Sequence, residues 1–402
     1  MNLKSFFPTQ VSAHATRFLL ATLLDGLGIG VFNVCYQFYL ITFGFGGSEI
    51  GLISTVGALG ATVLTLPFGV LADRYGRRRL LLVGFAMDAI SLIFLVTASS
   101  FPLFAFSSLL NGIAASGRAL LTPIYSDFFD RADMDKAFGL YGFVSIAGDS
   151  VGSMTGFLPQ LLVSGYGYTQ QSAYWTTLTV SVSLLLSAMA FYADSARGGK
   201  DVRSPTPRKQ VLASRSVVVR FSLVMAVRAM AQRLFFSLFP YYVNKKFGIE
   251  SAGLGTLFFT SMLLLAVVNM IAPKVSERLG TTRSIMASLS LSIPFYVMIP
   301  LAPNYLWLSL FYVLRMCVAN VSSPLVGSLL MKLVKAEERA TANSIATVVG
   351  MATGAACPAI SGRLMETASV DQAAFAGIMV FSAYPALFYL LFRKATDEPE
   401  QP

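Results

Sequence analysis

The stretch Gly69-Val-Leu-Ala-Asp73-Arg74-Tyr-Gly76-Arg77-Arg-Arg79 is a dense charged turn between two long apolar runs. A weaker copy, Glu277-Arg278-Leu-Gly280-Thr-Thr-Arg283, follows 204 residues later. It keeps the acid, the arginine after the acid, the glycine and the closing arginine. The surroundings repeat as well, at an offset of 202 residues: Tyr39, Gly51 and Leu52 return as Tyr241, Gly253 and Leu254. A chain that repeats both its charged turn and its hydrophobic rhythm is predicted to be an internal duplication.

The composition excludes an ordinary soluble domain. Apolar residues make up 55% of the chain and charged residues 12%, with a mean hydropathy of +0.66, whereas soluble domains carry about 25% charged residues. A membrane-spanning helix needs about 20 mostly apolar residues, so 402 residues allow about twelve spans. The apolar runs are long and do not alternate, which disfavours a β-barrel. The sequence therefore predicts an all-α membrane protein with twelve transmembrane helices.

The apolar runs divide the chain into two halves of six spans each. A polar stretch rich in Gly, Pro and Ser with six Lys or Arg, residues 194–216, separates them and is predicted to be a cytoplasmic linker. The predicted domains are a bundle over 1–193 and a second bundle over 217–402. The predicted spans are 16–41, 49–71, 80–98, 103–126, 137–163, 173–193, 217–243, 251–273, 284–302, 305–331, 340–362 and 373–392.

The formal charge of +10 is explained by orientation in a membrane and not by nucleic-acid binding. Of the 30 Lys and Arg, only Lys245, Lys246 and Arg363 fall in loops on one side. Four fall inside spans and the other 23 lie on the opposite side or within a turn of it. This positive-inside asymmetry predicts that both termini are cytoplasmic. Short loops and the lack of a targeting segment favour a bacterial inner membrane.

No complete catalytic or metal-binding set is found. The three cysteines are isolated in apolar spans and are read as small core residues. Gly198-Gly199-Lys200-Asp201 lacks the upstream glycine and the hydroxyl residue of a phosphate loop. Ile146 breaks the Gly-x-Gly-Asp pattern of an intramembrane aspartyl protease ahead of Asp149. We therefore expect no enzyme activity, no metal and no cofactor.

The charged turn, its relic, the twelve spans and the basic linker together resemble the major facilitator superfamily. The resemblance implies two pseudo-symmetric six-helix bundles and transport of a small solute. In that family the acid of the turn caps a helix of the other bundle and its arginines pair with carboxylates, which closes the cytoplasmic side. The gating residues implied here are Gly69, Asp73, Arg74, Gly76, Arg77 and Asp127, with Glu277, Arg278, Gly280 and Arg283 as the repeat. The alternative is that Arg77 to Arg79 only set the topology, with Gly69 and Gly76 serving packing and a tight turn.

Charged residues inside spans are candidates for function, because inserting one into hydrocarbon costs at least about 2.5–3.5 kcal/mol. Asp25 and Arg118 both lie about 12–14 Å above the cytoplasmic ends of their spans at 1.5 Å per residue, so a pair is possible. We expect Asp25, Arg118 and Asp149 to take part in proton coupling. The alternative is a static ion pair. Asp88 is expected to be structural, and the glycines at 148, 152 and 156 are expected to allow close helix packing, although they resemble part of a drug-exporter motif.

Arginines without an acid partner in the second half suggest an anionic solute, because guanidinium binds carboxylate or phosphate bidentately. Arg228 and Gln232 share a helical face, and Arg315 has no acid in any second-half span. The alternative is pairing with Asp149 or with backbone carbonyls of the other bundle. Polar and aromatic side chains near mid-span complete the candidate binding residues: Asn33, Tyr36, Gln37, Asn111 and Asn320.

The sequence thus predicts a monomeric secondary transporter, driven by protons, that moves a small organic solute, with an organic anion favoured. A proton-coupled exporter of lipophilic drugs or cations is the alternative, because of Asp25, the aromatic residues and the partial glycine motif. A sensor or receptor that has lost transport is a third reading. An intramembrane enzyme comes last. The expected partners are the solute, protons and the lipid bilayer.

Overall fold

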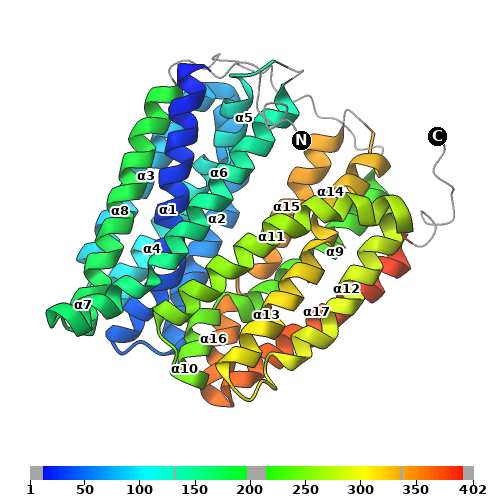
Figure 1. The fold of residues 1–402 in the computed structure, drawn as a ribbon. Helices are drawn as coiled ribbons and strands as arrows, with labels where there is room; N and C mark the ends of the chain where they lie inside the picture. The colour runs from blue at the N-terminus through cyan, green and yellow to red at the C-terminus, as the bar shows by residue number, and fades with distance from the viewer. Residues whose placement is uncertain (1–11, 131–132, 197–213, 336–337, 393–402) are drawn as a thin grey trace, which may run out of the picture. The chain divides into compact units, whose positions relative to one another are not determined.

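The computed structural model describes residues 12–130, 133–196, 214–335 and 338–392, and every regular element in these ranges is a helix (Figure 1). The first half contains α1 (Ala13–Thr42), α2 (Gly47–Tyr75), α3 (Arg77–Thr97), α4 (Phe101–Arg118), α5 (Leu121–Ser126), α6 (Met134–Met154), the 3-10 turn η2 (Thr155–Phe157), α7 (Leu158–Tyr166) and α8 (Gln170–Ser195). The second half contains α9 (Arg215–Phe236), α10 (Phe239–Phe247), α11 (Ser251–Leu279), α12 (Thr281–Met298), α13 (Tyr305–Asn320), α14 (Ser322–Leu333), α15 (Arg339–Gly354), α16 (Cys357–Thr367) and α17 (Val370–Phe392).

All twelve predicted spans are helical, as expected for an all-α membrane protein. Eight segments among the described residues are long and apolar enough to cross a membrane by length and composition alone. The other four spans, 103–126, 137–163, 251–273 and 284–302, are helical but fall short of that threshold in the described part. Boundaries differ from the prediction by a few residues, mostly because helices extend into polar flanks, as α2 does to Tyr75.

Five of the predicted spans are broken into two helices, which the sequence analysis did not anticipate. The breaks lie between α4 and α5, α6 and α7, α9 and α10, α13 and α14, and α15 and α16. Each precedes a proline by about one turn, because proline lacks the N–H for its i−4 carbonyl and its ring clashes there. The prolines are Pro123, Pro159, Pro240, Pro324 and Pro358. Pro67, Pro294 and Pro385 instead lie inside continuous helices, so a proline allows a break without requiring one.

The internal repeat is visible in the backbone. Helices α2 and α11 are both 29 residues long, and the glycines that follow them, Gly76 and Gly280, have φ values of 95° and 81°. Only glycine adopts this conformation without strain, so both turns need glycine at the same repeat position. Gly76 therefore serves a tight turn as expected. A Cβ added to Gly69 would meet nothing within 4 Å among the described residues, and close packing at Gly69 stays a prediction.

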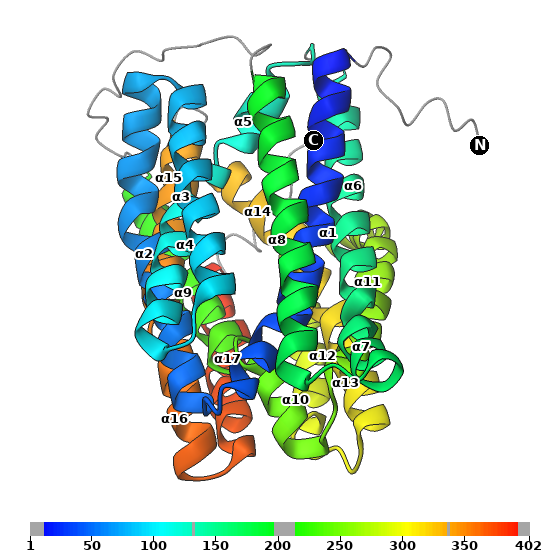
Figure 2. The same cartoon turned by 90° about the vertical axis from the view of Figure 1, so that its left-hand side faces the viewer.

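Helices α1, α3, α4, α6 and α8 form most of one compact unit, and their packing is set by small residues (Figure 2). A Cβ added to Gly26 on α1 would lie 2.8 Å from the Ser145 carbonyl oxygen on α6, and one on Gly84 of α3 would lie 3.0 Å from Gly117 Cα on α4. The glycines expected to serve packing on α6 do lie against α1: a Cβ on Gly148 would be 2.8 Å from the Leu23 carbonyl oxygen.

The chain forms two compact units. One boundary between them falls between residues 209 and 210, inside the predicted linker, most of which lies outside the described residues. We call the two parts unit 1 and unit 2. Unit 1 holds residues 1–45, 56–209 and 250–259, and unit 2 holds 46–55, 210–249 and 260–402. The first turns of α2 and α11 thus cluster with the unit that does not contain the rest of their helix. In the second unit, α9 packs against α15 and α17, and α12 against α13.

Candidate functional site

Arg118 and Asp88 form an ion pair within unit 1, in which Asp88 is buried and the Arg118 side chain is 25% exposed. The guanidinium of Arg118, the last residue of α4, donates from Nε to Asp88 Oδ2 at 3.1 Å and also from Nη2. Asn111 Nδ2 donates to Asp88 Oδ1 at 3.0 Å, so both carboxylate oxygens are bonded. Asp88 is 1% exposed. The close contact of Gly84 and Gly117 brings α3 and α4 together beside this pair.

Asp25 does not hold Arg118, although the sequence allowed that pairing. It lies within electrostatic range of both Arg118 and Asp88 and makes no hydrogen bond to either. The reason is geometric: Asp88 is on the helix packed directly against α4, whereas Asp25 is on α1 between α6 and α8. Asp88, which we expected to be structural, is therefore the direct partner of two candidate residues, Arg118 and Asn111.

Asp149 on α6 faces α1. The Asn33 side chain hydrogen-bonds to it, and Asp25 is within electrostatic range. Its Oδ1 atom is buried and accepts no hydrogen bond from the described residues. Three carboxylates and one arginine thus share the interior of unit 1, with hydroxyl and amide groups around them. On the same helix as Asp25, Tyr36 stacks on Phe32 with ring centroids 4.6 Å apart, and Gln37 is half-buried.

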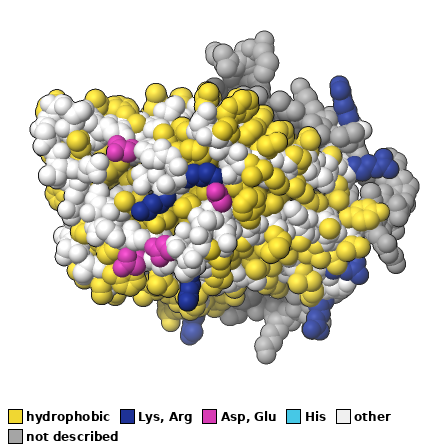
Figure 3. Space-filling view, turned by 90° about the horizontal axis from the view of Figure 1, so that it is seen from below, with side chains coloured by type: hydrophobic (Ala, Val, Ile, Leu, Met, Phe, Trp, Pro, Cys, Tyr) yellow, Lys and Arg dark blue, Asp and Glu magenta, His cyan; other side chains and the backbone are white. Residues whose placement is uncertain are grey.

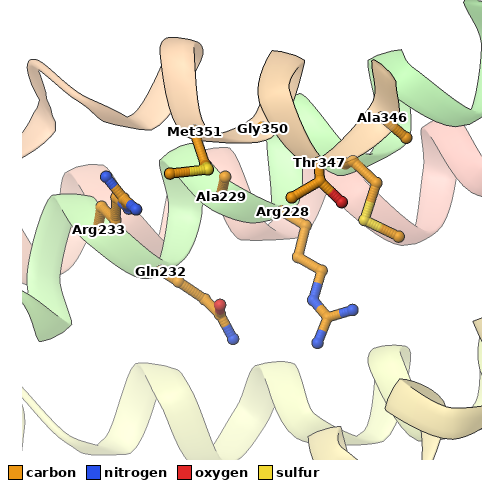
Figure 4. Close-up of a pocket in the computed structure, with 9 residues that line it drawn as sticks. Arg228, Ala229, Gln232, Arg233, Ala346, Thr347, Gly350 and Met351 are labelled. Atoms are coloured by element: carbon orange, nitrogen blue, oxygen red, sulfur yellow. The ribbon is translucent and has the colours of Figure 1, made fainter. Parts of the chain in front are cut away.

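A basic pocket of about 280 Å³ lies in unit 2 between α9 and α15 (Figure 4). From α9 it is lined by Arg228, Gln232 and Arg233, and Figure 4 shows that Arg228 and Gln232 point the same way while Arg233 points apart from them. Its lining contains no acidic residue; the rest is Met225, Ala229, Ala346, Thr347, Gly350 and Met351. Arg228 Nη2 donates to Ser323 Oγ on α14 at 3.1 Å. The pocket can therefore accept a small anion beside apolar and thioether surface.

Arg315 is not among the residues that line this pocket. It is 2% exposed, and its Cζ lies 4.3 Å from the ring centroid of Phe236, 5.0 Å from that of Tyr296 and 5.2 Å from that of Phe381. Among the described residues it makes no ion pair, as the lack of acids in the second-half spans implied. Asn320, also a candidate, donates from Nδ2 to the Met316 carbonyl at 2.8 Å.

The sequence analysis missed several residues that complete these sites. The aromatic residues around Arg315 come from α9, α12 and α17, and Ser323 comes from α14. No spacing in the sequence relates them, because they meet only when distant helices pack. The pocket wall on α15 was missed for the same reason. For Asp88 a signal existed: Gly84 precedes it by one turn and Gly117 adjoins Arg118, which marks a close α3–α4 crossing.

The charged turn is only partly described. The side chains of Asp73 and Glu277 lie outside the described residues. Arg74 lies over the ring of Tyr75 with its Cζ 5.5 Å from the centroid, and Arg278 and Arg283 are exposed. Arg77 is half-buried at the first position of α3. Asp127 directly follows α5 and has an interaction partner.

Seen from below, the described surface carries few charged groups (Figure 3). Hydrophobic side chains dominate its described part, with a few acidic and basic groups between them. Lys246 on α10 is one of the three basic residues expected here. It donates to Asp371 Oδ1 at 2.5 Å, and Tyr242 donates to the same carboxylate oxygen at 2.7 Å. This cluster ties α10 to the start of α17.

A duplicated helical membrane protein with a basic pocket in one unit is a solute carrier by architecture. The sequence model of the Major Facilitator Superfamily matches residues 18–229 and 221–402. The chain belongs to this superfamily, whose members are transporters and not enzymes. It is a multi-pass membrane protein.

Individual relatives are distant. The chain is 25% identical over 296 residues to the class H tetracycline resistance protein of Pasteurella multocida, which covers 68% of this chain and 69% of that protein. It is also 25% identical over 196 residues to the 3-(3-hydroxy-phenyl)propionate transporter of Escherichia coli strain K12, over 48% of this chain and 47% of that one. The crystal structure of a bacterial homologue of the human lysosomal transporter Spinster matches with a TM-score of 0.76 at 15% identity, covering 96% of this chain and 98% of that chain. The last likeness is one of fold.

Proposed function

We propose that this chain is a proton-coupled secondary transporter that moves a small organic anion across the membrane by alternating access. The observation that carries the proposal is the pocket in unit 2, which is lined by Arg228 and Arg233 with no acid among its lining residues. A guanidinium inside a membrane protein is costly without a counter-charge. A carboxylate or phosphate on the solute would supply that charge through paired hydrogen bonds.

The rest of the lining supports an organic solute of modest size. Sites for small molecules usually enclose about 300–1,000 Å³, and this pocket of about 280 Å³ lies just below that range. Met225 and Met351 offer flexible, polarizable surface that suits an apolar or aromatic body. Gln232 and Thr347 add neutral hydrogen-bonding groups. The relative named a 3-(3-hydroxy-phenyl)propionate transporter is consistent with a solute of this kind.

Proton coupling is assigned to unit 1. Asp25 and Asp149 are carboxylates within the bundle and within electrostatic range of each other. Asp149 keeps one buried oxygen without a hydrogen bond among the described groups. A carboxyl group that gains and loses a proton as its surroundings change is a suitable carrier. In this proposal Arg118 supplies the fixed positive charge against which Asp25 titrates, with Asn33, Tyr36, Gln37, Asn111, Arg315 and Asn320 kept as further candidate binding residues.

The charged turn is proposed to gate the cytoplasmic side. Arg74, Arg77 and Asp127 would hold that side closed together with Asp73, and Gly69 and Gly76 would shape the turn. The repeat at Glu277, Arg278, Gly280 and Arg283 would act in the same way for the second unit. We further propose that the protein acts as a monomer in a bacterial inner membrane with both termini in the cytoplasm, as the distribution of Lys and Arg supports.

A second candidate function is the export of lipophilic compounds in exchange for protons. It is favoured by the relative named a tetracycline resistance protein, which matches over two thirds of the chain. The two functions differ in the solute that should stabilise the protein. An anion carrier depends on Arg228, whereas a cation exporter depends on the carboxylate of Asp25.

The deciding experiment is thermal stabilisation of the purified protein by a panel of organic anions and lipophilic cations at pH 6 and pH 8. We expect anions to raise the melting temperature, and Arg228→Gln to weaken anion affinity about tenfold, because a charged hydrogen bond contributes about 1.5–3 kcal/mol. Arg363→Gln, at an exposed arginine of α16, is the matched control and should change nothing. Stabilisation by cations alone, lost in Asp25→Asn, would reject the anion and establish the exporter.

A further inference from the structure

Arg315 combines full burial with an unused hydrogen-bonding edge. Its Nη1 donates to the Met316 thioether at 3.6 Å, while Nε and Nη2 are buried and have no hydrogen-bond partner among the described residues. Nε and Nη2 lie along one edge of the planar guanidinium, and their N–H groups can bind a carboxylate with two parallel hydrogen bonds. The aromatic rings stabilise the positive charge of the guanidinium by cation–π contact. Such contact does not supply the two hydrogen-bond acceptors that the Nε and Nη2 N–H groups require.

One helix carries residues of the pocket and a ring that contacts this arginine. Arg228, Gln232 and Phe236 are spaced by four residues on α9, so they share one helical face. The first two line the pocket, and the third lies over Arg315 with its ring centroid 4.3 Å from Cζ, the nearest of the three rings. Arg228 is within electrostatic range of Arg315. Phe236 therefore lies one turn beyond the pocket residue Gln232 on α9 and against the guanidinium of Arg315.

We propose that Arg315 is a second anion-binding group of the pocket and that Phe236 covers it. The solute is then an aromatic organic anion, whose ring takes the position of Phe236 among the rings of Tyr296 and Phe381. Its carboxylate takes the free Nε and Nη2 groups of Arg315. This inference rests on the proposed function and adds the chemical class of the solute.

Phe236 is placed where the backbone can move. It is the last residue of α9, ahead of the break that Pro240 imposes before α10. Because Pro240 has no N–H, the Phe236 carbonyl lacks its i+4 donor, and α9 is followed here by a shorter-range bond from the Leu238 N–H to the Phe235 carbonyl at 3.3 Å. The neighbouring rings keep an aromatic environment for an incoming ring, with Tyr296 and Tyr312 at 5.3 and 5.9 Å from the Phe236 centroid.

Charge favours the same arrangement. Arg228 and Arg315 repel each other, and no acidic side chain among the described residues pairs with either. One carboxylate bound near both would neutralise part of that repulsion, and its affinity would gain from the desolvated surroundings. A neutral or cationic aromatic solute would leave the free guanidinium edge without a partner.

The test uses two acids that differ only in the ring, 3-phenylpropanoate and 3-cyclohexylpropanoate, with binding to the purified full chain measured by calorimetry at pH 7.5. We expect the wild type to prefer the phenyl acid. Arg315→Lys keeps the charge but loses the planar edge and should weaken the phenyl acid about tenfold and remove the preference. Phe236→Leu removes the covering ring and should tighten binding of the phenyl acid several-fold. Arg363→Gln should match the wild type.

The outcomes separate this inference from the proposed function. If both acids bind equally and depend on Arg228 but not on Arg315, the anion carrier stands and the role of Arg315 is overturned. If neither acid binds the wild type, the anion carrier itself is overturned. Should Arg315→Lys fail to fold, modification of Arg315 by phenylglyoxal decides: it should be slow in the wild type, fast in Phe236→Ala, and slowed again there by the phenyl acid. Equal rates of Arg315 modification in the wild type and in Phe236→Ala would overturn the proposal that Phe236 covers Arg315.

Discussion

At the scale of single residues, the two units stabilise a buried arginine in different ways. Arg118 has an acid, Asp88, whose second oxygen is held by Asn111. Arg315 has three aromatic rings and no acid among the described residues. The first arrangement satisfies the guanidinium permanently and suits a fixed charge. The second leaves hydrogen-bonding capacity unused, which suits a group that meets a charged solute.

Removing the acid from the first arrangement should cost stability. We expect Asp88→Asn to lower the free energy of unfolding by about 3 kcal/mol, because Arg118 would keep its charge without a counter-charge in a buried site. The measurement is thermal unfolding in detergent. Asp194→Asn removes the acid of the exposed Arg17–Asp194 pair, 2.7 Å apart, and should change stability by less than about 1 kcal/mol.

A double variant checks the cause. Asp88→Asn combined with Arg118→Gln should recover part of the lost stability, since no uncompensated charge remains. If the double variant were as unstable as the sum of both single variants, the loss would come from packing and not from the ion pair.

Which of these residues the sequence reveals depends on how local the signal is. A charge inside an apolar run is visible without a structure, and Asp25, Arg118, Asp149, Arg228 and Arg315 were singled out in that way. Their partners were not, because pairing depends on which helices pack together. The chain placed Asp88 on α3 next to Arg118, and it placed three distant rings around Arg315.

At the scale of helices, glycine and proline determine the local geometry. Gly26 and Gly148 allow α1 and α6 to approach closely, and the same holds for Gly84 and Gly117 on α3 and α4. Prolines divide five spans into two helices each. The sequence predicted the glycine contacts on α6 correctly from their spacing. It marks where breaks can occur, since each one precedes a proline by about one turn, but Pro67, Pro294 and Pro385 lie inside continuous helices, so the prolines alone do not predict the breaks.

The glycine contacts can be tested with two substitutions on one helix. A Cβ at Gly152 would collide with the Leu27 carbonyl oxygen of α1, whereas a Cβ at Gly139 would meet nothing within 4 Å. We expect Gly152→Ala to destabilise the protein by about 1–3 kcal/mol through overpacking. Gly139→Ala should be neutral or stabilising by up to about 1 kcal/mol. Equal effects in thermal unfolding would show that helix propensity alone, and not the α1–α6 contact, controls both positions.

At the scale of the whole molecule, the two units differ in the charge of their interiors. The interior of unit 1 is rich in carboxylates, and the pocket of unit 2 is basic. Repeat symmetry was predicted from one charged turn, and the equal lengths of α2 and α11 and their matching glycine turns agree with it. The same symmetry does not predict the division of charge, because Asp25 and Arg228 have no repeat partners of the same type.

This division predicts that proton coupling and solute binding can be separated. In proteoliposomes, Asp25→Asn should abolish accumulation driven by a pH gradient, while exchange of solute between the two sides continues, because the pocket in unit 2 is intact. Asp194→Asn is the control and should accumulate solute like the wild type. Uptake in Asp25→Asn that still followed the pH gradient would exclude Asp25 as the proton carrier.

The aromatic surroundings of Arg315 also bear on how the chain is inserted during synthesis. An arginine near the middle of a span opposes release of that span into lipid by about 2.5–3.5 kcal/mol. Phe236 and Tyr296 precede Arg315 in the chain, and Phe381 follows it. When α13 leaves the ribosome, two of its three rings have therefore already been made. Helix α13 can leave the translocon already docked on α9 and α12, and α17 then completes the enclosure with Phe381.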